Sequence, residues 1–107
     1  MQTLQVKGNA GNLELQVHQA VSPNGDGQND VFYIEGIRDH PDNQVTIMNR
    51  NGVKIYETKA YDNAARVFDG HSNINGALQQ PGTYFYLIQY MVNGQGRHLT
   101  GYFVLKY

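Results

Sequence analysis

The longest apolar run in the chain is residues 83–92, TYFYLIQYMV. Aromatic and β-branched residues favour strands, and this run carries apolar side chains on both faces, which is typical of a central strand in a β-sandwich. Pro81-Gly82 precedes the run and Asn93-Gly94-Gln95-Gly96 follows it as a turn. Residues 98–107 then alternate again and predict the antiparallel partner of the first strand.

Shorter strands are expected before this pair in the chain. Asn51-Gly52 joins two alternating runs and suits the two positive φ angles of a type I′ hairpin turn. The span 59–80 is rich in Asn, Asp and Gly and indicates irregular structure. In all, strands are predicted at residues 3–7, 13–18, 31–35, 45–48, 53–58, 83–92 and 98–107. With about seven strands and no convincing helix, the expected fold is all-β, an immunoglobulin-like antiparallel β-sandwich in one domain of residues 1–107.

The composition limits the possible functions. The 107 residues suffice for one core, and a formal net charge of −1 implies neither a nucleic acid nor an anionic membrane as partner. The absence of cysteine excludes disulfides, thiolate metal sites and a cysteine nucleophile. No apolar run approaches the length of a membrane span, and the first residues do not start a signal peptide. If the natural protein is exported, we expect its export signal to lie elsewhere.

The stretch 22–30, SPNGDGQND, carries oxygen ligands at alternate positions, namely Asn24, Asp26, Gln28 and Asp30. Calcium binds six to eight such oxygens in a glycine-bent loop, so a Ca²⁺ site is one hypothesis. The alternative is an array of Asx turns, in which the same side chains bond backbone amides. The strand predicted at 31–35 argues against an EF-hand, although Glu35 stands at the twelfth position.

No catalytic residues are predicted. The four histidines, at positions 18, 40, 71 and 98, lack zinc-ligand spacing, and no serine lies in a nucleophile elbow. Asp26 and Asp30 lack the cleft that a glycosidase pair needs, and Asp69 before Gly70 is typical of a turn. Tyr84, Tyr86 and Tyr90 share one face of their strand. They either pack in the core or form an exposed aromatic strip that stacks on sugar rings.

An ordered set of motifs across residues 21–107 resembles the gliding motility-associated C-terminal domain, the type B sorting domain of the type IX secretion system. The set comprises Ser22-Pro23-Asn24-Gly25-Asp26-Gly27, Asn29-Asp30, Phe32, Ile34-Glu35-Gly36-Ile37, Ile47-Met48-Asn49-Arg50, Gly52, Lys54, Tyr56-Glu57, Phe68-Asp69-Gly70, Pro81-Gly82-Thr83-Tyr84-Phe85-Tyr86 and Thr100-Gly101-Tyr102-Phe103. The family usually has Trp where Asn51 stands and often where Phe68 stands, and Phe68 keeps an aromatic anchor.

The resemblance implies a non-catalytic domain that follows a cargo protein and directs it, through the periplasm, to the cell surface or the medium. The implied partner is the outer-membrane secretion machinery, and the isolated domain is expected to be a monomer. Within the final strand, the residues expected to meet this partner are Tyr102, Phe103, Val104, Leu105 and Lys106. The alternative function is a carbohydrate- or surface-binding module of an adhesin or polymer-degrading enzyme.

Overall fold

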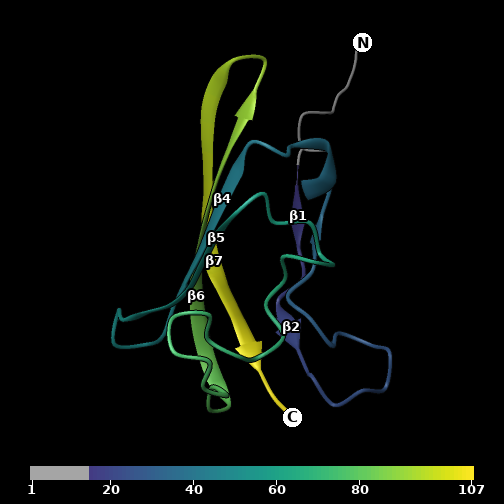
Figure 1. Ribbon diagram of the computed structural model, residues 1–107, viewed down its shortest axis with the longest axis vertical. Helices are drawn as coiled ribbons and strands as arrows, with labels where there is room; N and C mark the ends of the chain where they lie inside the picture. The colour runs from purple at the N-terminus through teal and green to yellow at the C-terminus, as the bar shows by residue number, and fades with distance from the viewer. Residues whose placement is uncertain (1–14) are drawn as a thin grey trace.

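A computed structural model describes residues 15–107 of the chain, and Figure 1 shows its arrangement. The described residues form two layers. A five-stranded sheet has the order β2-β7-β6-β4-β5, and a two-stranded sheet pairs β1 with β3. The strands are β1 (Gln16–Val17), β2 (Ala20–Val21), β3 (Ile34–Glu35), β4 (Asn43–Met48), β5 (Lys54–Lys59), β6 (Gly82–Val92) and β7 (Gln95–Leu105). The all-β, sandwich-like fold predicted from the sequence is confirmed.

The centre of the large sheet is the hairpin of β6 and β7, as predicted. β7 begins earlier than expected because Asn93 and Gly94 alone form the turn, with φ angles of 51° and 79°. Two positive φ angles define the type I′ turn that suits a two-residue loop. The turn between β4 and β5 was expected to be of this type and is not. There only Gly52 has a positive φ (80°), and the register shifts by one residue after Ile47.

The N-terminal part differs more from the expectation. The strand predicted at 3–7 and the start of the one at 13–18 lie outside the described residues. The strand predicted at 31–35 is limited to Ile34–Glu35, because Phe32 donates its amide to the Phe68 carbonyl in the irregular segment. β2 was not predicted, and it pairs with β7 in parallel, whereas the other strand pairs are antiparallel.

The core lies between the two layers and is rich in aromatic rings. Phe103 is fully buried and stacks on Phe32, with 4.6 Å between ring centroids. Phe68 and Tyr84 also contact Phe103, at 5.9 and 5.7 Å. This cluster joins β6, β7 and the irregular segment 60–80, which therefore belongs to the second layer although it contains almost no strand.

Three asparagine side chains take the place of missing strand partners. The Asn63 amide accepts the Ile34 N–H (2.9 Å) and donates to the Ile34 carbonyl (2.8 Å). Asn73 makes the same pair of bonds with Glu57, and the buried Asn43 makes it with Tyr61. Since an unpaired buried backbone group is costly, these amides allow the irregular segment to cover the sheet.

The aromatic strip considered above as a sugar-stacking surface is not exposed. Tyr84, Tyr86 and Tyr90 point into the core and expose 5, 6 and 8% of their surface. Tyr86 lies over Gly101, its neighbour on β7, where any Cβ would overlap the tyrosine ring. The interpretation as an exposed strip is therefore wrong, and the alternative, packing in the core, is correct. Among residues 15–107, no helix is long and apolar enough to span a membrane.

The buried tyrosines predict a loss of stability at alkaline pH. Burial, together with the nearby Asp69 carboxylate, raises the pKa of Tyr56 from 10.0 to about 12, and burial raises the pKa of Tyr61 as well. Both groups hold their proton more tightly in the folded state, so their contribution is complete below pH 10 and decreases above it. That of Tyr56 is lost as the pH rises through about 12, and that of Tyr61, whose pKa is raised further, is still decreasing there. We expect the free energy of unfolding, measured by urea denaturation, to fall in this range by up to about 1.4 kcal/mol per pH unit for each tyrosine, and the urea midpoint to fall with it. A midpoint that stays constant up to pH 12 would contradict the burial of these hydroxyls.

Candidate functional site

The loop of residues 22–30 is held together by hydrogen bonds from its backbone N–H groups to its own side-chain oxygens. The two carboxylate oxygens of Asp30 accept the backbone N–H groups of Gly25 (3.0 Å) and Gly27 (2.9 Å). Both glycines have φ angles near +80°, a conformation that side chains with a Cβ rarely adopt. The sequence therefore folds here as a narrow loop around one carboxylate.

The remaining hypothesised calcium ligands follow the same pattern. Asn24 Oδ1 accepts the N–H of Asp26 (3.2 Å), and Asp26 Oδ1 accepts the N–H of Gln28 (2.8 Å). These are Asx turns, and they are the alternative that the sequence left open. Of the four residues, Asn24, Asp26 and Gln28 are exposed and Asp30 is half-buried. Asn24, Asp26 and Asp30 use side-chain oxygens to accept backbone amides of the same loop.

Two carboxylates outside this loop that the sequence analysis singled out, those of Glu35 and Asp69, make other contacts. Glu35 Oε2 lies 2.6 Å from His18 Nε2, and Asp69 Oδ1 accepts the N–H of His71 (3.2 Å). Asp69 thus makes the turn that its sequence context indicated. Within residues 15–107, no three His, Asp or Glu side chains are grouped so that they could share a metal ion.

The predicted partner-binding residues alternate between the two faces of β7. Phe103 and Leu105 are fully buried in the core, and Val104 is partly buried on the opposite face. Tyr102 exposes 48% of its surface, and Lys106 is exposed. Of the five, Tyr102 and Lys106 therefore present the most side-chain surface to a partner of the folded domain.

The outer backbone edge of this strand is covered near its end. Val104 donates its N–H to the Gln19 carbonyl, and Lys106 donates to Val21, each at 2.9 Å. β2 thus occupies the edge where an incoming strand would pair (Figure 1).

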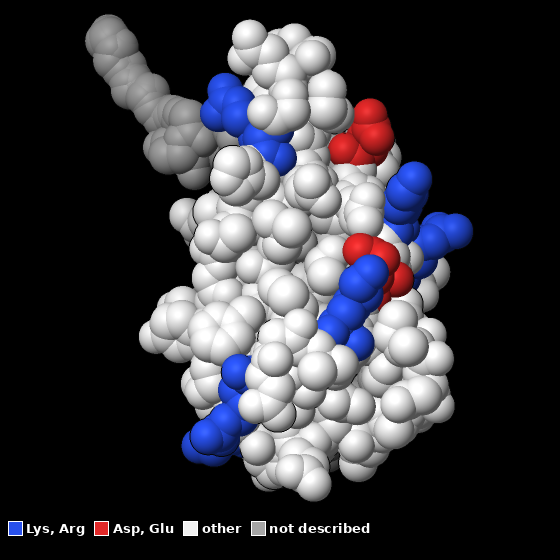
Figure 2. Space-filling model, turned by 90° about the vertical axis from the view of Figure 1, so that its left-hand side faces the viewer, with Lys and Arg blue, Asp and Glu red and all other residues white. Residues whose placement is uncertain are grey.

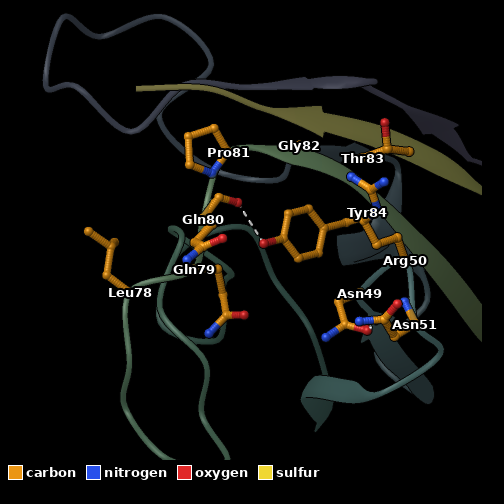
Figure 3. A pocket seen from close by; sticks show the side chains of 10 residues that line it. All are labelled: Asn49, Arg50, Asn51, Leu78, Gln79, Gln80, Pro81, Gly82, Thr83 and Tyr84. Atoms are coloured by element: carbon orange, nitrogen blue, oxygen red, sulfur yellow. Dashed lines mark hydrogen bonds between the residues drawn. The ribbon is translucent and has the colours of Figure 1, made fainter.

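A polar hollow of about 330 Å³ lies between the β4–β5 turn and residues 78–84 (Figure 3). Its wall includes the amides of Asn49, Asn51 and Gln79, with the Arg50 side chain beside them. Tyr84 closes one side and donates its hydroxyl to the Gln80 carbonyl (2.6 Å). Asn51, where the resembling family usually has Trp, is therefore part of an open hollow.

Sequence reasoning missed the apolar side chains that face solvent. Phe85 exposes 44% of its surface and lies directly opposite Tyr102 in the register of β6 and β7. A strand that is apolar on both faces does not reveal which face is covered. Gly101 is the one sequence signal for which face is covered. It lies opposite Tyr86, and its missing side chain leaves room for the Tyr86 ring on the core face.

Comparison with known proteins is consistent with the resemblance seen in the sequence. The family model described as CHU_C type IX secretion signal domain matches residues 15–105. No curated protein matches the chain. The match covers nearly the whole chain and the complete described sandwich.

Proposed function

The chain belongs to the type IX secretion signal domain family, and we propose that it is a non-catalytic sorting domain recognised, as a folded unit, by proteins of the outer-membrane secretion machinery. The family match supports a sorting function and implies export to the cell surface or the medium. In this proposal the domain follows its cargo in one polypeptide, crosses the periplasm with it, and docks by protein–protein contact.

The burial of the motif residues supports recognition of the folded domain by the partner, as opposed to recognition of a linear sequence. Phe32, Phe68 and Phe103, three aromatic positions of the family-like motifs, are completely buried in one cluster. A receptor cannot read buried side chains as a linear signal. The motifs therefore specify a fold, and the fold presents the surface that a partner contacts.

The proposal is tested by moving the domain relative to a foreign cargo. Residues 1–107 are fused behind, or in front of, a periplasm-targeted fluorescent protein in a bacterium that has this secretion system. We expect fluorescence outside the cell only for the fusion in which the domain follows the reporter. Equal behaviour of the two fusions would contradict a sorting signal and favour a binding module.

The second candidate, a carbohydrate-binding module, is supported by the polar hollow. Amides, a guanidinium group and a tyrosine are groups that bind sugar hydroxyls, and Asn49, Arg50, Asn51 and Tyr84 bring them together. Retention of the chain on insoluble polysaccharides, lost in Arg50→Ala, would support this function. Passage of the chain without retention would remove it.

We propose that the loop 22–30 contributes to function by holding the fold through its own hydrogen bonds. Asp30→Ala is expected to lower the free energy of unfolding by about 1–2 kcal/mol, because two backbone amides lose a charged acceptor. On this account, added calcium or a chelator leaves the melting temperature of the wild type unchanged. A rise with calcium that Asp30→Ala abolishes would instead support the calcium hypothesis.

A further inference from the structure

The side of the five-stranded sheet that faces away from β1 and β3 carries an apolar row. Met48, Phe85 and Tyr102 are direct neighbours across β4, β6 and β7. Together with Leu87 and Thr100 they line a shallow, mostly apolar hollow of about 390 Å³, here called the outer-face patch. Phe85 and Tyr102 each expose nearly half of their surface, 44 and 48%.

The fold does not need these side chains to be apolar. Alternate residues of the same strands, Tyr84, Tyr86 and Phe103, already fill the core. A sheet face that meets water normally carries polar residues, and contiguous exposed apolar surface marks an interaction site. Aromatic side chains are also the residues that most often dominate the energy of protein interfaces.

The charges around the outer-face patch are mainly positive. Figure 2 shows this face, where Lys and Arg side chains surround a largely uncharged centre and acidic side chains are fewer. By register Lys54 and Lys59 lie on this face, and Lys106 follows β7 with the same alternation. Six carboxylates belong instead to the loops, the short 3-10 helix Ile37–Asp39 and the small sheet: Asp26, Asp30, Glu35, Asp39, Asp62 and Asp69. Asp42, directly before β4, lines a hollow together with Lys59.

Figure 2 shows acidic side chains at two places on this face, and one of these carboxylates, that of Glu57, is already satisfied by hydrogen bonds. Glu57 accepts hydrogen bonds from Lys54 (2.9 Å), Gln44 (2.9 Å) and Thr46 (3.0 Å). These bonds, that of Lys54 first, lower the pKa of Glu57. Among the described residues, Lys59 and Lys106 form no ion pair. With Lys54, Lys59 and Lys106 against the carboxylates of Glu57 and Asp42, the face has a small net positive charge, although the chain as a whole carries −1.

We propose that the outer-face patch is the docking surface of the sorting domain, and that it binds a protein whose apolar contact area is bordered by carboxylates. This inference rests on the proposed function and names the surface that performs it. Charge complementarity at the border steers encounter and orientation, and the aromatic pair supplies the buried contact.

Two other occupants fit the face less well. Recognition of an anionic membrane relies on clusters of four to eight basic residues, and the lysines here are separated and flank an apolar centre. In a symmetric dimer through this face, each partner would present the same positively charged surface to the other. A protein with acidic borders avoids both difficulties.

The test uses surface variants of the 1–107 fusion in the export assay. Phe85→Thr combined with Tyr102→Thr keeps strand propensity and removes both rings. We expect it to reduce export about tenfold or more at an unchanged melting temperature. The matched control is Tyr33→Thr, which alters a tyrosine that is 41% exposed in the other layer, and its export should equal that of the wild type. Export of the double variant at the wild-type level would overturn the inference.

Charge reversal tests the acidic border of the partner. Lys59→Glu is expected to reduce export roughly threefold, because a charge at the border acts mainly on the association rate. Arg66→Glu is its control, since Arg66 is exposed in the irregular segment of the other layer. Equal export of the two variants would overturn the acidic border of the partner.

A photoreactive phenylalanine analogue placed at position 102 identifies what binds the outer-face patch. The same analogue at position 33, in the other layer, is the control. A protein adduct at 102 only supports the inference, whereas an adduct with lipid, polysaccharide or a second copy of the chain overturns it. The crosslinking result separates the docking-surface proposal from the proposed sorting function. A wild-type fusion that is not exported but still crosslinks a protein at 102 would leave the docking surface standing and remove the sorting function. Failure of both readouts would remove both.

Discussion

Replacing Phe103 with alanine is expected to lower the free energy of unfolding by about 3–5 kcal/mol, the largest effect of any single change considered. The ring is fully buried and contacts Phe32, Phe68 and Tyr84. Its removal leaves a cavity at the point where β6, β7 and the irregular segment meet. Because domains have a total stability of about 5–15 kcal/mol, this loss is a large fraction of the free energy of unfolding. Urea unfolding of the isolated domain measures the loss.

The neighbouring residue supplies the control for this prediction. Tyr102→Thr changes an exposed ring on the same strand, and its unfolding free energy should stay within about 1 kcal/mol of the wild type. In the export assay we expect both variants to be exported less than the wild type, Phe103→Ala because the domain is destabilised and Tyr102→Thr while it remains folded. A Phe103→Ala domain that melts like the wild type would contradict the central position of this ring in the core.

Removing a single oxygen by Tyr61→Phe is expected to cost about 2–4 kcal/mol. The hydroxyl of Tyr61 donates to the Phe32 carbonyl (2.6 Å) and accepts the Phe68 N–H (2.9 Å), and all three residues are buried. Phenylalanine keeps the packing but leaves a buried carbonyl and a buried amide without this partner. Since unpaired buried groups bear their full desolvation cost, the effect exceeds that of an ordinary hydrogen bond.

The matched control is Tyr33→Phe, which removes a hydroxyl from a tyrosine that is 41% exposed. Its effect should stay within about 0.5 kcal/mol. Thermal and urea unfolding of the two variants provide the comparison. The Tyr61→Phe domain should also lose stability less steeply above pH 10, because one of the buried tyrosines with a raised pKa is gone. Equal stability of the two variants would show that the hydroxyl of Tyr61 is not a bridge between Phe32 and Phe68.

The long strands could be predicted because their signals are local. Alternating side chains and glycine turns located β4, β5, β6 and β7 to within a few residues. The short strands could not be predicted in the same way. β2 is two residues long, and its place beside β7 depends on contacts with Val104 and Lys106, far along the chain. The same holds for Asn43, Asn63 and Asn73, whose side chains act as strand partners only after the layers have come together.

The candidate site was predictable in composition but not in orientation. The sequence indicated Tyr102 and Lys106 as partner-binding residues, and both are exposed. It did not separate them from Phe103 and Leu105, which are buried, because the strand is apolar on both of its faces. For the same reason it presented Tyr84, Tyr86 and Tyr90 as candidates for an exposed strip and did not indicate that Phe85, on the opposite face, is the exposed ring.

The most direct test of a sorting function is the ratio of extracellular to periplasmic fluorescence for a reporter followed by residues 1–107. The ratio is measured in a strain with the type IX system and in the same strain without its outer-membrane translocon. We expect a high ratio in the first strain and a background ratio in the second, with the domain intact in both periplasms. Equal ratios in the two strains, with a folded domain, would contradict the sorting function.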